Sequence, residues 1–332
     1  MSARLRLLII KTSSLGDVVH ALPAISDIAR ARPGWQIDWI CEEAFADIPA
    51  LHPAVSRVIP CAIRRWRRSW WSAQTRNEVT AMKSALREPG YDMVLDLQGL
   101  LKSAWIARQA RGTRHGYAWN SAREPLASLA YDVRHVVAWG QHAIARNRLL
   151  AAAALGYVPD GAPRYGVMPE PRPARGATPR VVALHATSRT DKLWPEDRWR
   201  DLLRRLSAQG YSTVLPWGSP TERERGERLA AGIAGAEVPA RMAPAALAAL
   251  FATARVVIGV DTGLVHLAVA AGAPTLALFG PTEPGLTGVV GERAPAISLG
   301  GHGVFPEVAQ VEEAVAALLR PAARSDAPGG PA

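Results

Sequence analysis

The first residues equipped for chemistry lie in a polar segment near the amino terminus. Thr12-Ser-Ser-Leu-Gly16 follows a short apolar run, and a helical pattern begins at Asp17. A carboxylate at a strand-to-helix transition is placed to accept a proton from an attacking hydroxyl group. The same position suits a helix cap, so Asp17 has both a catalytic and a structural interpretation from the sequence alone.

A loop in the second half of the chain has the groups that bind phosphate oxygens. Thr187, Ser188 and Lys192 follow an apolar run and offer two small hydroxyl groups and a mobile ammonium group. Lysine is scarce, with four among the 39 basic residues, which favours a specific role for Lys192. The alternative is a solvent-exposed polar loop without a ligand.

Gly259-Val-Asp-Thr-Gly263 is the clearest strand-to-helix loop of the chain. Its glycine lets a ligand approach the backbone, and the free N–H groups at the helix start predict an anion site, strengthened by the helix dipole. Asp261 is either a ligand contact or the cap of this helix. His266, one turn into the helix, either faces the ligand or packs in the core.

A further loop, Trp217-Gly-Ser-Pro-Thr-Glu222, also precedes a helical pattern. Glu222 fits a capping box with Ser219, which is a structural role. The alternative is that the carboxylate of Glu222 accepts hydrogen bonds from ribose hydroxyl groups, as acidic residues do in nucleotide sites.

Several familiar chemistries lack their motifs here. Neither of the glycine motifs of P-loop NTPases and dehydrogenases is present, nor are the H-E-x-x-H and G-x-S-x-G motifs. No D-x-D occurs, so we expect no metal and no cofactor, and charge on a diphosphate would be neutralised by Lys192 and helix N-termini. Cys41 and Cys61, the only cysteines, are too few for a metal framework, and we expect no disulfide.

The elements that position these loops alternate between short β-rich runs and helical patterns, which predicts an α/β protein with parallel sheets. Strands are expected at 5–11, 36–41, 92–97, 180–186, 211–216, 255–260 and 275–279, and helices at 17–32, 195–209, 220–234, 244–253, 262–271 and 307–320. Four prolines mark a linker at 169–180 between an N-terminal domain, 1–168, and a C-terminal domain, 181–320. The tail, 321–332, is expected to be disordered.

Length and composition agree with this division. The chain has 332 residues, 48% of them hydrophobic and 20% charged, as in a soluble protein of about two domains. No apolar run is long enough to span a membrane and no signal peptide is recognised, so we expect a cytoplasmic protein. Two domains whose strand ends face each other would form one ligand-binding cleft.

The positive charge is unevenly distributed. Residues 1–150 hold 21 basic and 12 acidic residues, and the remainder holds 18 and 17, within a formal net charge of +10. Such asymmetry indicates an anionic partner for the first half: a nucleic acid, an acidic membrane surface or an acidic substrate. The segment 64–71, rich in arginine and tryptophan, is expected to be an exposed insertion.

Taken together, the polar loops closely resemble the lipopolysaccharide heptosyltransferases of glycosyltransferase family 9, the heptosyltransferase I type in particular. The resemblance rests on the segments 11–23, 96–103, 185–196, 217–222 and 259–266, in order and at similar spacing. It implies a GT-B fold, in which two Rossmann-like domains face each other across a cleft. It also implies inverting transfer of L-glycero-D-manno-heptose from ADP-heptose to a 3-deoxy-octulosonic acid (Kdo) residue on lipid A, without an essential metal.

The resemblance implies roles for individual residues on the donor side. Asp17 corresponds to the general base, and Lys192 to a catalytic cation at the diphosphate. Glu222 corresponds to the ribose contact, Met242 to the adenine lining and Asp261 to a heptose contact. The remaining donor contacts, to phosphate and sugar, are Thr187, Ser188, Thr262, Gly263 and His266.

On the acceptor side the resemblance implies a cationic surface for Kdo carboxylates and lipid A phosphates. The expected acceptor-binding residues are Ser14, Gly16, Arg64, Arg65, Arg67, Arg68, Gln98 and Lys102. The protein is expected to be a monomer, bound peripherally to the cytoplasmic face of the inner membrane through its anionic leaflet. Interleaved tryptophans suit such an interface.

Two other functions remain open from sequence. Heptosyltransferase II has the same fold and donor but a heptose acceptor, and the opening Lys-Thr-Ser-Ser-x-Gly-Asp motif together with Asp-Leu-Gln-Gly-Leu-Leu-Lys-Ser favours the first type. A basic nucleic-acid-binding protein is the alternative of another class. Against it, the excess charge is confined to one half and no nucleic-acid-reading motif is present.

Overall fold

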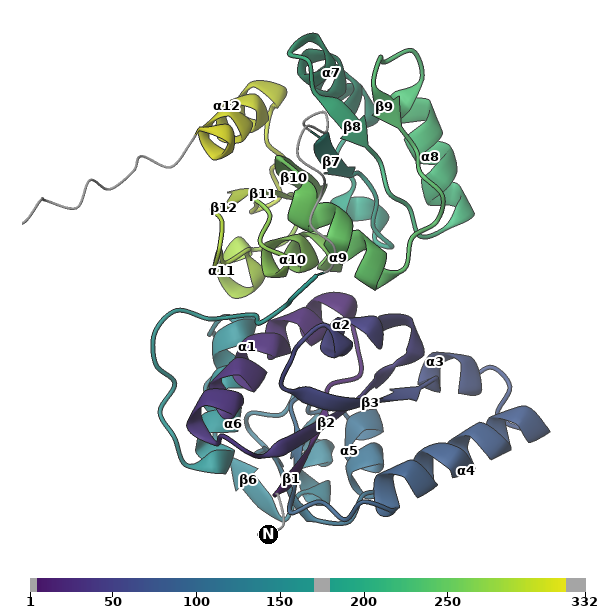
Figure 1. Cartoon of the computed structure of the whole chain (residues 1–332), viewed down its shortest axis with the longest axis vertical. Helices are drawn as coiled ribbons and strands as arrows, with labels where there is room; N and C mark the ends of the chain where they lie inside the picture. Colours follow the sequence, from purple (N-terminus) through teal and green to yellow (C-terminus); the bar gives the residue numbers. More distant parts are fainter. Residues whose placement is uncertain (1–4, 170–179, 321–332) are drawn as a thin grey trace, which may run out of the picture.

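A computed structural model describes residues 5–169 and 180–320 of the chain. Most of the expected linker and all of the expected tail lie outside these residues. Two α/β domains follow one another along the chain, shown from purple to teal and from green to yellow in Figure 1. No helix of the described residues is long and apolar enough to cross a membrane.

The N-terminal domain is built on a six-stranded sheet in the order β3-β2-β1-β4-β5-β6. All its strand pairs are parallel, which is the doubly wound Rossmann arrangement. Its elements are β1 (Arg6–Ile10), α1 (Leu15–Ala31), β2 (Gln36–Glu42), η1 (Glu43–Phe45), α2 (Asp47–Ala50), β3 (Val55–Cys61), α3 (Ile63–Trp66), α4 (Ala73–Arg87), β4 (Met93–Asp96), α5 (Leu101–Ala107), β5 (Thr113–Tyr117), η2 (Pro125–Ala130), β6 (Val133–His135) and α6 (Ala143–Leu155).

The C-terminal domain repeats this topology in a second parallel sheet, in the order β12-β11-β10-β7-β8-β9. Its elements are β7 (Arg180–Leu184), η3 (Thr190–Lys192), α7 (Glu196–Ala208), β8 (Ser212–Val214), α8 (Pro220–Ala230), β9 (Ala236–Glu237), α9 (Pro244–Thr253), β10 (Val256–Val260), α10 (Gly263–Ala270), β11 (Thr275–Phe279), α11 (Pro284–Thr287), β12 (Ala296–Gly300) and α12 (Val308–Leu319). The predicted GT-B architecture is thus present.

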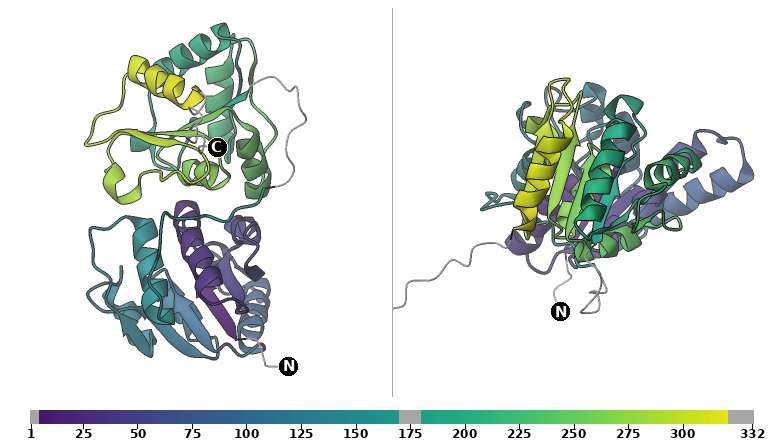
Figure 2. Two further views of the ribbon diagram at one scale, coloured as in Figure 1. Left: turned by 60° about the vertical axis from the view of Figure 1, so that its left-hand side comes forward. Right: turned by 90° about the horizontal axis from the view of Figure 1, so that it is seen from above.

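The apolar faces of the helices determine how the layers pack. Leu22 and Ile25 of α1 belong to the same buried cluster as Val265 and Leu267 of α10, so one hydrophobic core continues across the domain boundary. A separate cluster beneath α4 and α5 covers the opposite face of the N-terminal sheet. Figures 1 and 2 show α1 and α2 facing α10 and α9 where the two domains meet.

Several helices and strands predicted from the sequence agree with the observed ones, and others differ at one end. The predicted helix 244–253 and strand 275–279 are found with the same bounds. The helix predicted to begin at Asp17 begins at Leu15 instead, because Ser14 is its N-cap and Asp17 is its third residue. The helix predicted over 220–234 ends at Ala230, where α8 gives way to a turn.

Candidate active site

The polar loops lie at the topological switch points of the two sheets. Sheet order reverses between β1 and β4 in one domain and between β7 and β10 in the other. The segments that follow these strands carry Asp17, Gln98, Lys192 and Asp261. Doubly wound sheets bind ligands at such points, because neighbouring chains diverge there to opposite faces of the sheet.

Asp17 both caps its helix and faces a cavity. Its Oδ2 accepts hydrogen bonds from the backbone N–H of Ser14, at 2.9 Å, and from the Ser14 hydroxyl, at 3.1 Å. The half-buried carboxylate also lines a cavity of about 310 Å³ between the domains. The structural and the catalytic interpretation of this residue are therefore compatible, since one oxygen serves the helix while the group borders the cavity.

Gln98 holds the loop that leads to Asp17. Its Oε1 accepts from the N–H groups of Thr12 and Ser13, at 2.9 and 3.2 Å, and its Nε2 donates to the Ser13 carbonyl at 2.6 Å. Lys102 donates to the Ser13 hydroxyl at 2.6 Å. Both residues were expected to bind the acceptor. Gln98 also lines the cavity that contains Asp17, whereas Lys102 does not line it and is held on the Ser13 hydroxyl.

Three cations that are not among the predicted site residues line the same cavity as Asp17. They are Lys11, Arg123 and Arg146, and Leu286 and Thr287 close the cavity from the C-terminal domain. Lys11 had two signals in the sequence, the scarcity of lysine and its place at the start of the segment 11–23, whereas the two arginines had none. Arg123 comes from the loop before η2 and Arg146 from α6, and only the fold brings these two segments together.

Neighbouring groups fix the positions of two of these cations and affect the charge of one. Lys11 is buried and donates to the Leu97 carbonyl at 2.7 Å, and this burial lowers the pKa of its ammonium group, although the nearby Asp17 carboxylate opposes the shift. Arg146 lies over the ring of Trp139, 3.7 Å from its centroid, and donates to the Ser121 carbonyl. Arg146 is thereby held rigidly, which favours recognition of a negatively charged group.

On the other side of the cleft, Lys192 and Asp261 form an ion pair. The Lys192 Nζ lies 2.5 Å from Asp261 Oδ2, and this oxygen also accepts from the Thr282 hydroxyl at 2.6 Å. The pair joins the loop after β7 to the loop after β10. Thr262 is the N-cap of α10 and Gly263 is its first residue. The free N–H groups at the beginning of this helix therefore lie close in the chain to Asp261 of the ion pair.

Four other predicted donor residues also lie on the C-terminal domain, and their contacts and burial differ from one residue to the next. Glu222 accepts from the Gly218 N–H at 2.7 Å, and its own N–H donates to Ser219, so it has the structural contacts that the sequence allowed. Thr187 is half-buried and Ser188 exposed in the loop after β7. Met242 packs partly buried before α9.

The two domains touch where α1 and α10 begin. A Cβ atom on Gly263 would lie 2.7 Å from the Gly16 nitrogen, so this contact leaves no room for a side chain at residue 263. Only glycine permits the two helix starts to approach this closely. Gly16, an expected acceptor residue, thus lies at the domain interface.

Three histidines surround this interface. The His20 and His266 rings lie 4.2 Å apart between centroids, and His142 lies 5.7 Å from His20. His142 Nδ1 accepts from the Ile144 N–H, so its Nε2 donates across the domains to the Gly288 carbonyl at 2.9 Å. Burial lowers the pKa of His266 to about 4, and Asp261, Asp17 and Lys192 are among the charges near it.

This shift predicts acid-sensitive stability. The folded protein holds His266 neutral, so its contribution is complete above the ordinary pKa of about 6.5 and is lost as pH falls towards 4; the size is on the order of 3 kcal/mol. Replacing His266 by glutamine should reduce the fall in melting temperature between pH 7 and pH 5. The control is His302→Gln, because the His302 side chain is exposed. An unchanged dependence of melting temperature on pH in His266→Gln would contradict the lowered pKa of His266.

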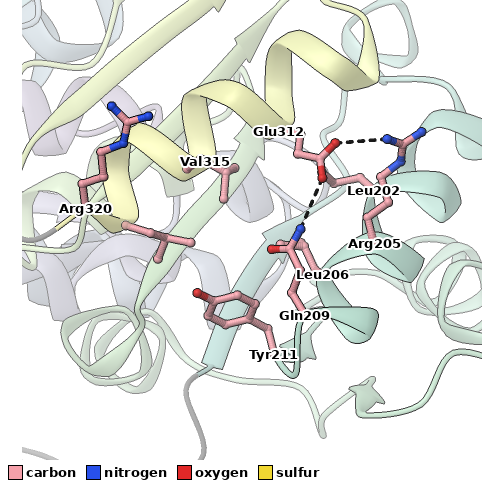
Figure 3. A pocket seen from close by; sticks show the side chains of 10 residues that line it. Leu202, Arg205, Leu206, Gln209, Tyr211, Glu312, Val315 and Arg320 are labelled. Carbon is pink, nitrogen blue, oxygen red and sulfur yellow. Dashed lines mark hydrogen bonds and ion pairs between the residues drawn. The ribbon is translucent and has the colours of Figure 1, made fainter.

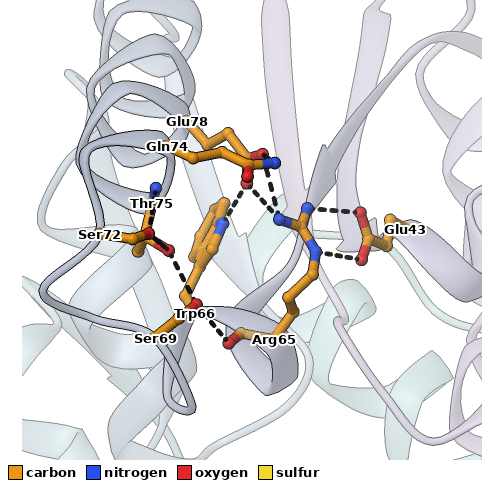
Figure 4. Close-up of polar contacts among 8 residues, drawn as sticks. All are labelled: Glu43, Arg65, Trp66, Ser69, Ser72, Gln74, Thr75 and Glu78. Carbon is orange, nitrogen blue, oxygen red and sulfur yellow. Dashed lines mark hydrogen bonds and ion pairs between the residues drawn. The ribbon is translucent and has the colours of Figure 1, made fainter.

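The arginines of the segment 64–68 lie outside the cavity that contains Asp17. Arg65 is held between Glu43, at 3.0 Å, and Glu78, at 2.9 Å, as Figure 4 shows. Its charge is therefore largely balanced within the protein. Arg64 stacks on Phe45, while Arg67 and Arg68 are exposed; the acceptor-binding role of these four residues stays a prediction.

A second cavity, of about 510 Å³, is formed by the packing of two helices of the C-terminal domain. It lies between α7 and α12, away from the switch points, and Figure 3 shows its lining. Glu312 there accepts from Arg205 at 3.1 Å and from Gln209 at 3.2 Å, which ties the two helices together. Among the described residues, no group of three or more His, Cys, Asp or Glu is arranged to hold a metal ion.

Comparison with known proteins agrees with the resemblance drawn from the loops. Residues 79–314 match the model of glycosyltransferase family 9 (heptosyltransferase). Lipopolysaccharide heptosyltransferase 1 of Pseudomonas aeruginosa is 52% identical over 290 residues, which are 86% of this chain and 82% of that protein.

Solved structures of Escherichia coli heptosyltransferase WaaC share the fold over nearly the whole chain. The structure with ADP has a TM-score of 0.88 and 44% identity, covering 94% of this chain and 99% of that one. The structure with ADP-2-deoxy-2-fluoro heptose has a TM-score of 0.83 and 44% identity, covering 94% and 98%. The chain therefore belongs to glycosyltransferase family 9, the heptosyltransferase family, and is a glycosyltransferase.

Proposed function

We propose that this chain transfers L-glycero-D-manno-heptose from ADP-heptose to a Kdo residue of Kdo-lipid A, with inversion, during synthesis of the lipopolysaccharide inner core. The observation that carries the proposal is the cavity between the domains, which combines the Asp17 carboxylate with three cations. A sugar acid offers a hydroxyl nucleophile and a carboxylate, so it matches both kinds of group.

The donor is assigned to the C-terminal domain. Lys192 and the start of α10 supply positive potential at the switch point between β7 and β10, where doubly wound sheets bind phosphate groups. The relative solved with an ADP-heptose analogue supports the same donor for this chain. When a diphosphate enters, Lys192 would exchange part of its contact with Asp261 for the phosphate oxygens.

The proposed reaction is a single displacement. Asp17 accepts the proton of the Kdo hydroxyl as that oxygen bonds to the anomeric carbon, and the bond to the ADP oxygen breaks on the opposite face. Negative charge grows on the departing diphosphate, where Lys192 and the N–H groups of α10 stabilise it. The tight contact of Gly16 with Gly263 supports a closed cleft that excludes water and limits hydrolysis of the donor.

A lipid-anchored acceptor requires that the protein work at a membrane surface. We therefore place the chain, as a monomer, on the cytoplasmic face of the inner membrane. The excess of basic residues in the N-terminal half supports attraction to an anionic leaflet. No nucleic-acid partner is proposed.

Release of ADP from ADP-heptose is the direct test of this function. Kdo-lipid A should support release, whereas a heptosylated acceptor should not, because the second candidate, heptosyltransferase II, uses a heptose acceptor. UDP-sugars should give no transfer. Release with the heptosylated acceptor alone would replace the proposed acceptor by that of the second candidate.

The cations of the cavity yield a sharper prediction about the acceptor. Arg123→Gln should raise the acceptor KM between about tenfold and a hundredfold, because a charged hydrogen bond contributes about 1.5–3 kcal/mol. The donor KM should stay within about twofold, since the donor lies on the other domain. The control is Arg111→Gln, an exposed arginine of the same domain that does not line the cavity. Equal acceptor saturation curves for the two variants would exclude Arg123 from the acceptor site.

A further inference from the structure

An exposed apolar surface lies on the N-terminal domain beside the cavity of Asp17. Leu101 and Trp105 are one turn apart on α5, and Leu126 and Leu129 are three residues apart on η2, so each pair shares one helix face. These four side chains are 40–60% exposed. They are called the apolar patch below.

The two elements of the apolar patch are joined side by side. The Leu101 N–H donates to the Glu124 carboxylate, just before η2, at 2.6 Å, and Ala104 packs with Ala127 and Tyr131 between the two helices. On the other side of α5, Ile106 enters the core under the sheet. The four exposed apolar side chains therefore lie on two elements that pack against each other.

Cations border the apolar patch. Lys83 of α4 lies 5.5 Å from the centroid of the Trp105 ring, and Arg134 donates to the Ser128 carbonyl of η2 at 3.0 Å. Arg123, three residues before Leu126, lines the cavity that contains Asp17. Apolar side chains bordered by cations match the two layers of an anionic bilayer surface: headgroups and acyl chains.

The same sheet face carries a second apolar feature. Trp70 and Trp71, both strongly exposed, precede α4, which packs with α5 over one hydrophobic cluster. Figure 1 shows α4 and α5 in the same part of the N-terminal domain. A second copy of the chain is a poor occupant for this face, because its own cations would meet those of the first.

We propose that the apolar patch docks the protein on an anionic lipid bilayer, with Leu126 and Leu129 inserted among the upper acyl chains. Docking in this orientation turns the mouth of the cavity, marked by Arg123, towards the membrane that would hold a lipid-linked acceptor. The benefit of this orientation for catalysis rests on the proposed function, because it requires a lipid-linked acceptor. Binding of the apolar patch to an anionic bilayer does not depend on that acceptor.

Vesicle binding without acceptor tests the docking surface. The full chain should cosediment with vesicles that contain phosphatidylglycerol and much less with pure phosphatidylcholine vesicles. The double variant Leu126→Gln/Leu129→Gln should bind the anionic vesicles at least about tenfold more weakly, because two leucine side chains lose their place in the hydrocarbon. The control Val158→Gln/Val304→Gln, which changes two exposed apolar residues outside the patch, should bind like the unchanged protein. Equal binding of the patch variant and the unchanged protein would overturn the proposal.

Activity measurements separate this inference from the proposed function. The patch variant should use an acyl-free, water-soluble Kdo acceptor as well as the unchanged protein does, but its apparent KM for acceptor in vesicles should rise about tenfold. If neither protein transferred heptose to Kdo, the proposed function would fail while the vesicle result still stood. If light scattering showed a dimer that the patch variant abolished, with vesicle binding unchanged, the patch would be a protein interface and the docking proposal would be wrong.

Discussion

Replacing Asp17 by asparagine is expected to lower turnover between about a hundredfold and ten-thousandfold, the range that general-base catalysis contributes. The amide keeps the size of the side chain and an oxygen that accepts from Ser14, so the start of α1 is retained. It cannot take the proton of the acceptor hydroxyl. The measurement is ADP release at saturating substrates, together with the melting temperature, which should change little.

Ser14→Ala is the matched control for the capping role of Asp17. It removes the hydroxyl that donates to Asp17 and the side chain of the N-cap, at a cost of about 1 kcal/mol in stability. Turnover in this variant should stay within roughly tenfold of normal, because the carboxylate remains. Near-normal turnover in Asp17→Asn, with a stability loss similar to that of Ser14→Ala, would leave Asp17 with a capping role only.

Replacing Lys192 by alanine is expected to slow transfer between about a hundredfold and a thousandfold, as the loss of one charge-stabilising group does in other active sites. ADP should also bind at least about tenfold more weakly, because the ammonium group is the cation nearest the proposed diphosphate position. AMP, which lacks the second phosphate, should lose much less affinity. Calorimetric titration of both nucleotides separates a phosphate contact from a general disturbance of the loop.

Arg189→Gln is the control for Lys192. Arg189 lies in the same loop, is exposed and pairs with Asp191 rather than with Asp261. Its removal should leave ADP affinity and turnover nearly unchanged. A chelator should have no effect on either protein. Loss of activity with a chelator, combined with normal activity of Lys192→Ala, would show that a metal ion rather than this lysine neutralises the diphosphate.

Local patterns were sufficient to predict the alternating elements and the polar loops at their junctions. The strand β11 and the helix α9 follow from runs of apolar residues and from the residues that begin and end them. Asp17, Lys192 and Asp261 were recognised because they stand at strand-to-helix transitions, which a sequence displays directly. The two parallel sheets also follow from this alternation, since parallel strands need helical crossovers.

Tertiary structure alone decided which of these loops meet and what each charge faces. The bonds from Gln98 to Thr12 and Ser13 join residues about 86 positions apart, and no local pattern encodes them. Sheet order brings Lys11, Arg123 and Arg146 to one cavity with Asp17, although they lie on separate segments. The charge of Arg65, read as a binding group from the sequence, is balanced by Glu43 and Glu78. Residue type determines what chemistry is possible, whereas packing between distant segments determines the electrostatic surroundings in which a side chain acts.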